Sequence, residues 1–185
     1  VSSCGLGLAG NITLTEDMQP VDENFLNILP DIFRSSAMID RFHLFIPGWL
    51  LPKISEGQIY YGWAIDTEVF SEYLHHMRTE TYSQNIFDRL VRYDKNTAYV
   101  RHTKAVRKIA NAYCKLLFPH VRSLDGLSTE DLHTFQELYK KYCLHPAIEA
   151  RSYIYNQCRL IDSEYKHNTM PDFEIQHMLS VSDMS

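Results

Sequence analysis

The segment from Arg101 to Phe118 carries the clearest structural signal in the chain. Its apolar residues recur at the spacing of one helix face, and Pro119 follows directly after it. The positions that keep this spacing are Val106, Ile109, Ala110, Tyr113, Leu116 and Leu117. Because proline cannot continue a helix, the pattern predicts an amphipathic helix over 101–118 whose apolar face must be buried against other elements.

Further helices are predicted on both sides of this one. Asp66 precedes an apolar helix face that reaches Met77, Ser128 and Asp131 resemble a capping box, and Pro146 suits the first turn of a last helix. Most of the chain from Asp66 onward is therefore expected to be helical.

The part of the chain before Asp66 is predicted to be mixed. Asp22 precedes apolar residues at helical spacing up to Phe33, whereas residues 5–9 and 42–46 have the composition of short strands. The predicted fold class is mainly α, with a short α/β part ahead of a run of helices.

The composition narrows the classes of protein to consider. Hydrophobic residues make up 45% of the 185 residues, and the formal net charge of −5 argues against a surface built broadly for nucleic-acid phosphates. The four cysteines form no CxxC pair, the nine histidines lack metal-ligand spacing, and no apolar run approaches a membrane span. We therefore expect a cytoplasmic protein with reduced thiols, no metal site and no membrane association. Since Val1 is followed by no charged signal region, we also expect the chain to begin in the middle of a domain.

Three polar positions carry residue types that suit phosphate chemistry. Asn11 follows the first predicted strand, Arg41 precedes the second, and Arg101 opens the strongest helix, where Arg107 is a second candidate. Phosphoryl transfer depends on positioning and charge more than on covalent work by the protein, and a guanidinium group can hold two phosphate oxygens at once. A helix N-terminus adds a further preference for anions.

Each position also has an ordinary explanation. Asn11 on its own suits a turn, Arg41 could form a surface ion pair with Asp40, and Arg101 could belong to a solvated basic helix face. Their order along the chain favours a shared role, because it resembles the rear half of an AAA+ ATPase module. In that resemblance Asn11 corresponds to sensor 1, Arg41 to the arginine finger that acts across a subunit interface, and Arg101, or in reserve Arg107, to sensor 2.

A narrower resemblance runs over residues 35–165. The stretch Ala37–Trp49, AMIDRFHLFIPGW, closely resembles the LDR, H and PGW signature of the BREX Lon-like family, the BrxL-type proteins of phage defence. The segments Leu116–His120 and Ala147–Arg151 also resemble that family. The resemblance implies an ATPase that uses ATP and Mg²⁺, forms a homo-oligomeric ring and acts on DNA in phage defence.

The resemblance also implies a division of the chain. Residues 1–58 would be the C-terminal part of an AAA+ α/β core, 59–165 a helical lid with the helices that follow it, and 166–185 a flexible tail. The chain contains no Walker A motif, no acidic Walker B strand and no Lon-type domain with a Ser–Lys dyad. We therefore expect an ATPase in the full-length protein, whereas this segment alone should hold no cofactor and catalyse no reaction. The arginine-rich segment that the family carries after the lid is reduced here to Arg151.

Other functions remain open at this point. The chain could be an α-helical protein-interaction module that uses the aromatic residues Tyr139, Tyr142, Tyr153 and Tyr155, which also fit a core between the last two helices. It could also be part of an ATP-dependent Lon-type protease subunit with no role on DNA, or of an ATPase subunit kept for architecture. Whether Asn11, Arg41 and Arg101 lie on exposed edges or are buried in pairs helps to separate these functions.

Overall fold

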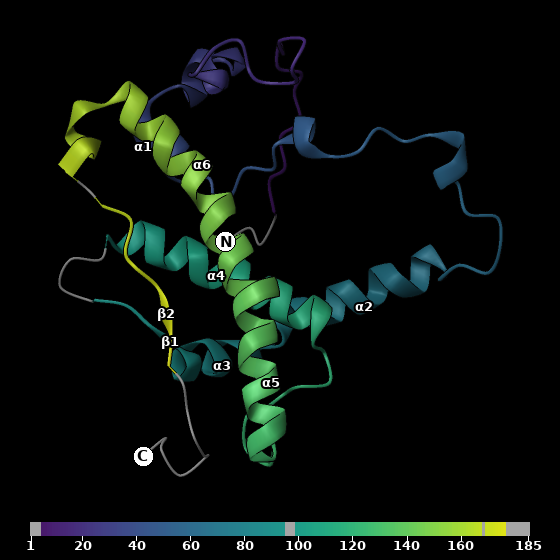
Figure 1. Ribbon diagram of the computed structural model, residues 1–185. Helices are drawn as coiled ribbons and strands as arrows, with labels where there is room; N and C mark the ends of the chain where they lie inside the picture. The colour runs from purple at the N-terminus through teal and green to yellow at the C-terminus, as the bar shows by residue number, and fades with distance from the viewer. Residues whose placement is uncertain (1–4, 95–98, 168, 177–185) are drawn as a thin grey trace.

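The computed structural model describes residues 5–94, 99–167 and 169–176, and it is mainly helical, as predicted (Figure 1). Its helices are α1 (Ser36–Ile39), α2 (Thr67–Thr79), α3 (Tyr82–Leu90), α4 (Val100–Leu117), α5 (Thr129–Tyr139) and α6 (His145–Ile161). Two short strands, β1 (Val91–Arg92) and β2 (Glu174–Ile175), pair antiparallel with Val91 opposite Ile175.

Helix α4 is the centre of the larger hydrophobic core, as its sequence pattern predicts, although Leu116 and Leu117 at its end are 48% and 50% exposed and were wrongly assigned to the buried face. Val106, Ala110 and Cys114 are fully buried on its inner face, where α3, α5 and the start of α6 pack around them. Phe118 ends the helix, and its backbone N–H donates to the carbonyl of Cys114 at 2.8 Å, one residue before Pro119. The C-terminal end of this helix is therefore set by local sequence.

Helices α5 and α6 run into one another through a π-helical turn over Lys140–Leu144. The Ser128 hydroxyl oxygen accepts the backbone N–H of Asp131 at 3.1 Å and so caps α5, and Pro146 lies in the first turn of α6. In Figure 1 the two helices form one long rod that crosses α4.

A second, smaller core attaches the N-terminal part to α6. Phe25, Leu26 and Ile39 pack there against Ile154 and Cys158. Aromatic rings extend this cluster, with the Phe25 and Phe45 centroids 4.8 Å apart and those of Phe45 and Tyr153 5.7 Å apart.

The strands predicted at 5–9 and 42–46 are wrong, because both segments are irregular in the structure. A strand needs a neighbouring backbone for its hydrogen bonds, and within the described residues no neighbouring strand pairs with either segment. The helix predicted between Asp22 and Phe33 is reduced to two 3₁₀ turns, Phe25–Ile28 and Asp31–Phe33. Pro30 stands between them and interrupts the helical hydrogen bonds.

The domain boundaries at 58/59 and 165/166 stay predictions. Strand β2 lies within the segment predicted as a tail, and residues 177–185 of that segment lie outside the described residues. Cys114, Cys143 and Cys158 are free and buried, and Cys4 also lies outside the described part.

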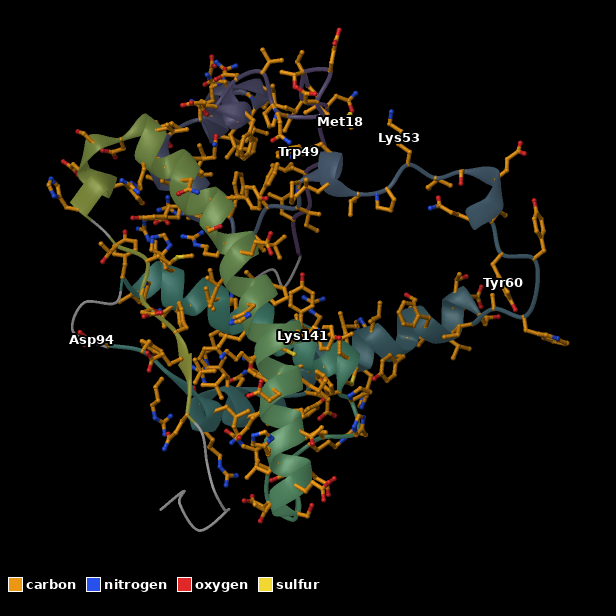
Figure 2. The ribbon with its side chains drawn as sticks, viewed as in Figure 1. Met18, Trp49, Lys53, Tyr60, Asp94 and Lys141 are labelled. Carbon is orange, nitrogen blue, oxygen red and sulfur yellow. The ribbon has the colours of Figure 1, made fainter. Side chains whose placement is uncertain are left out.

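An arm formed by residues 50–66 and α2 projects from the body (Figures 1 and 2). Figure 2 shows Tyr60 at its outer end, and Trp63 is 98% exposed. Asp66 caps α2 by accepting the N–H of Glu68 at 2.8 Å, yet the one buried residue of this helix is Met77 near its end. None of the described helices combines the length and the apolar character that crossing a membrane requires.

The core predicts a clear difference between two leucines of α5. Leu132 is fully buried and Leu138 is 37% exposed. Leu132→Ala should lower the free energy of unfolding by about 2–5 kcal/mol, because it removes buried methyl groups and leaves a cavity. Leu138→Ala should change it by roughly 0.5 kcal/mol or less. Urea unfolding followed by circular dichroism measures both, and similar losses for the two would contradict this packing.

Candidate functional site

Asp40, at the end of helix α1, lies in the interior of the protein. The Ser35 hydroxyl oxygen accepts the backbone N–H of Met38 at 3.3 Å and starts the helix, while Ile39 is fully buried in the smaller core. Asp40 is the C-cap of this helix, and its side chain has no exposure to solvent. A buried carboxylate requires partners that compensate for its lost hydration.

Two arginines from different helices supply those partners. Arg101, in the first turn of α4, donates from Nη1 to Asp40 Oδ2 at 2.6 Å. Arg151, in the middle of α6, donates from Nη2 to Asp40 Oδ1 at 2.5 Å. The carboxylate therefore joins α1, α4 and α6 at one point.

The guanidinium of Arg151 is fully buried and makes several further hydrogen bonds. Its Nη1 donates to the backbone carbonyls of Asp40 and Phe42, at 3.2 and 2.5 Å. Its Nε donates to His102 Nδ1 at 3.0 Å, so the proton of the neutral imidazole lies on Nε2. The side chain thus binds the chain on both sides of Arg41.

The pKa shifts in this cluster follow from burial and charge. Burial works to raise the pKa of Asp40, but the hydrogen bonds from Arg101 and Tyr165 and the charge of Arg151 outweigh it and hold that pKa below its ordinary value. Burial lowers the pKa of His102 to about 4, and the positive charge of Arg151 acts in the same direction. Asp40 is therefore ionised and His102 neutral near pH 7.

A pocket of about 390 Å³ opens beside this cluster. Three of the four predicted site residues, Arg41, Arg101 and Arg107, line it. Lys104 and Lys108, on the same helix as Arg101, also line the pocket. Five cationic side chains around one pocket make it suitable for a multiply charged anion such as a polyphosphate.

The arginines differ in how firmly they are held. Arg41 is exposed and donates to the carbonyl of Ala37 one turn back in α1. Arg101 is 44% exposed and already bonded to Asp40. Arg107 pairs with Asp88 and lies 6.0 Å from the centroid of the Phe87 ring. Arg41 is thus the one of the three whose described partner carries no charge.

Asn11 is not brought to this pocket. It is exposed in the irregular N-terminal segment and does not belong to the residues that line the pocket. The following residue, Ile12, is partly buried against the smaller core. Within the described residues, no three side chains of His, Cys, Asp or Glu come close enough together to hold a metal ion.

Reasoning from the sequence missed Asp40 and Arg151 as the centre of this site. The sequence suggested a surface pair between Asp40 and Arg41, whereas Asp40 pairs with Arg101 and Arg151 in the interior. One signal was present in the sequence, because Arg151 falls at helical spacing with Ala147 and Ile154 on the buried face of α6. A charged residue in such a position marks a buried partner elsewhere in the chain.

The fold and the pocket together describe a helical domain that presents a basic pocket supported by a buried ion pair. Comparison with known proteins places it in a family. The family described as "Lon-like protease BrxL-like, ATPase domain" matches residues 1–171, so the chain belongs to this family. The resemblance inferred from the sequence is confirmed.

Two curated relatives carry the name Lon-like protease BrxL. The protein of Escherichia coli O9:H4 (strain HS) is 28% identical over 151 residues, which cover 81% of this chain and 20% of the relative. The protein of Bacillus cereus (strain H3081.97) is 29% identical over 120 residues, which cover 64% of this chain and 18% of the relative. The matched part of the chain thus spans about a fifth of the length of these relatives.

The buried His102 predicts a loss of stability in mild acid. Its pKa is 6.5 in the unfolded chain and about 4 in the folded protein, so the unfolded state binds the proton first as the pH falls. The stabilisation is complete above pH 6.5 and is lost between pH 6.5 and 4, by up to about 3 kcal/mol. Asp40, whose pKa is also lowered, adds a loss below about pH 4.

Urea unfolding at a series of pH values tests this expectation. His102→Asn should flatten the dependence between pH 6.5 and 4, since asparagine does not titrate. The same substitution at His133, which is exposed on α5, serves as the matched control and should leave the dependence unchanged. An equally steep slope in His102→Asn would assign the acid sensitivity to other groups.

Proposed function

We propose that this chain is the part of a BrxL-type AAA+ ATPase that contacts the phosphates of ATP. Arg41 acts as the arginine finger and Arg101 as sensor 2, with Arg107 beside them. The observation that carries this proposal is that Arg41, far away along the sequence, lines one basic pocket together with Arg101 and Arg107. ATP and Mg²⁺ would be held mainly by parts of the full-length protein that this chain does not include.

The charges of the pocket support a role in binding phosphates. Asp40 is the one carboxylate among the residues that line it, and the buried Arg151 neutralises that carboxylate. Arg101 therefore keeps a net positive charge toward the pocket although it is bonded to Asp40. Its position in the first turn of α4 adds the attraction of the helix N-terminus for anions.

The shared pocket also determines which nucleotide the two arginines would contact. Arg41 and Arg101 of one chain face the same space, so they would act on the same phosphates. An arginine finger acts on the nucleotide of a neighbouring subunit, and in this arrangement Arg101 would act there too. A homo-oligomeric ring, the assembly that the family resemblance implies, provides such a neighbour.

Asn11 has a separate place in the proposal. As sensor 1 it would orient the attacking water, and this role requires a polar side chain at a fixed position. Its segment is exposed and irregular in the described structure, so a neighbouring strand of the full-length protein would have to order it. Action of the ring on DNA in phage defence is likewise the role that the family resemblance implies.

A second function is supported by the projecting arm. Trp63, Tyr61 and Ile54 are each more than 80% exposed, and exposed apolar groups of this size mark surfaces that contact other proteins. The chain would then serve chiefly as an interaction module. The other alternative, part of an ATP-dependent Lon-type protease subunit with no role on DNA, rests on the family resemblance alone. Loss of ATP hydrolysis on changing Arg41 alone would exclude a pure interaction module, and an assay for DNA binding by the full-length protein would then separate the ring that acts on DNA from the protease.

Arg41→Ala provides that test in the full-length protein. A finger stabilises the transition state more than the bound ground state, so hydrolysis should fall by roughly 10³–10⁵-fold while nucleotide binding stays nearly intact. Arg34→Ala is the matched control, because Arg34 is exposed in the same region and pairs with Asp31. A fall in steady-state ATPase activity of less than about tenfold would reduce Arg41 to a surface charge. Mixing the Arg41→Ala protein with a subunit that cannot bind ATP should restore part of the activity.

Arg101→Ala should weaken the binding of ATP more than that of ADP in the full-length protein, because the contact that disappears is the one to the γ-phosphate. Arg101→Lys should restore binding in part, since a point charge cannot hold two oxygens in the way a guanidinium does. Isothermal titration with both nucleotides measures the difference. If Arg101→Ala weakened both equally, the role would pass to Arg107, for which the same pair of titrations applies.

A further inference from the structure

The backbone around Arg41 is held by one buried side chain. Arg151 Nη1 donates to the carbonyls of Asp40 and Phe42, the residues directly before and after Arg41. Its Nη2 holds the Asp40 carboxylate, and its Nε donates to His102 of α4. The guanidinium is therefore bonded to two helices and to both flanks of the exposed arginine.

The same side chain controls the charge that faces the pocket. Asp40 carries one negative charge and lies between Arg151 and Arg101. With Arg151 present, the buried pair is neutral and the charge of Arg101 is left for an anion. Without Arg151, Arg101 would have to neutralise Asp40, and the pocket would lose one positive charge.

Few other side chains could perform both tasks. The three nitrogen atoms of the planar guanidinium of Arg151 bond to a carboxylate, two carbonyls and an imidazole nitrogen. Lysine would keep the charge but offers a single nitrogen at the end of a flexible chain. Methionine would keep much of the volume but neither the charge nor the donors.

We infer that Arg151 is the positioning residue of this pocket. It fixes the backbone that carries Arg41, and it neutralises Asp40 so that Arg101 can bind a phosphate group. Arg151 itself touches no ligand. The inference rests on the function proposed above, because it assigns to Arg151 the placement of the two arginines that contact ATP.

Two substitutions at position 151 separate the two tasks in the full-length protein. Arg151→Lys keeps the charge and loses the fixed geometry, so kcat for ATP hydrolysis should fall about 10²-fold while KM for ATP stays nearly unchanged. Arg151→Met also removes the charge, so kcat should fall and KM should rise. Arg159→Lys, a change of an exposed arginine on the same helix, is the matched control and should alter neither constant.

Thermal melts followed by circular dichroism establish that each variant is folded at the assay temperature. Where the changes at Arg151 prevent folding, a milder pair of variants at His102 tests the same geometry. His102→Leu removes the acceptor of the Arg151 Nε–H and should lower kcat at constant KM. His102→Asn provides an acceptor oxygen and should restore most of the activity, a rescue that a purely structural role would not produce.

The outcomes distinguish this inference from the function on which it rests. If Arg41→Ala retains its activity, the proposed function itself is wrong. The inference is overturned if Arg41→Ala is inactive while folded Arg151→Lys keeps kcat within about twofold of the wild type. In that case Arg41 functions without the hydrogen bonds from Arg151. Equal activity of His102→Leu and His102→Asn would overturn it as well.

Discussion

The ion pair between Asp40 and Arg151 is the interaction on which the rest of this structure depends. Both side chains have no solvent exposure, and taking two charges out of water costs several kcal/mol for each ion. The cost is offset because every charged atom has a partner: two arginines bind the carboxylate, and two carbonyls and an imidazole complete the guanidinium. These bonds connect α1, α4 and α6, so the pair joins the three helices at one point.

A rigid interior and an adaptable surface are thereby placed side by side. Arg151 and Asp40 cannot move without breaking several hydrogen bonds, whereas the side chain of Arg41, the residue directly after Asp40, is exposed. Chemistry that depends on the placement of charge requires such support, because a shift of about 1 Å is enough to lose much of the rate. The arm formed by residues 50–66 and α2 has the opposite character, because large apolar side chains such as Trp63 lie in solvent.

The parts of the fold that depend on neighbouring residues could be predicted from the sequence. Helix α4 follows from the spacing of its apolar residues and from the proline after it. Asp66 and Ser128 predict the N-terminal caps of α2 and α5. The predictions for 5–9 and 42–46 were wrong, because a strand depends on a partner that its own residues do not encode. For the candidate site, the motifs singled out Arg41 and Arg101, and both line one pocket. Their roles stay predictions. Arg151 was missed because its partners lie in α1 and α4, far away along the chain.

The π-helical turn between α5 and α6 changes which side of the long α5–α6 helix its later residues face. Tyr139, Cys143, Ala147 and Arg151 are all fully buried and follow one another at intervals of four residues. In an ideal α-helix, positions four apart rotate about 40° around the axis at each step, so the last of them would have turned well away from the first. The π turn over Lys140–Leu144 contains more residues per turn than an α-helix. Each residue in it therefore rotates less about the axis, which keeps the four residues closer to one side. The direction in which Arg151 points is therefore set upstream, by a local widening of the helix that itself carries none of the charged groups of the pocket.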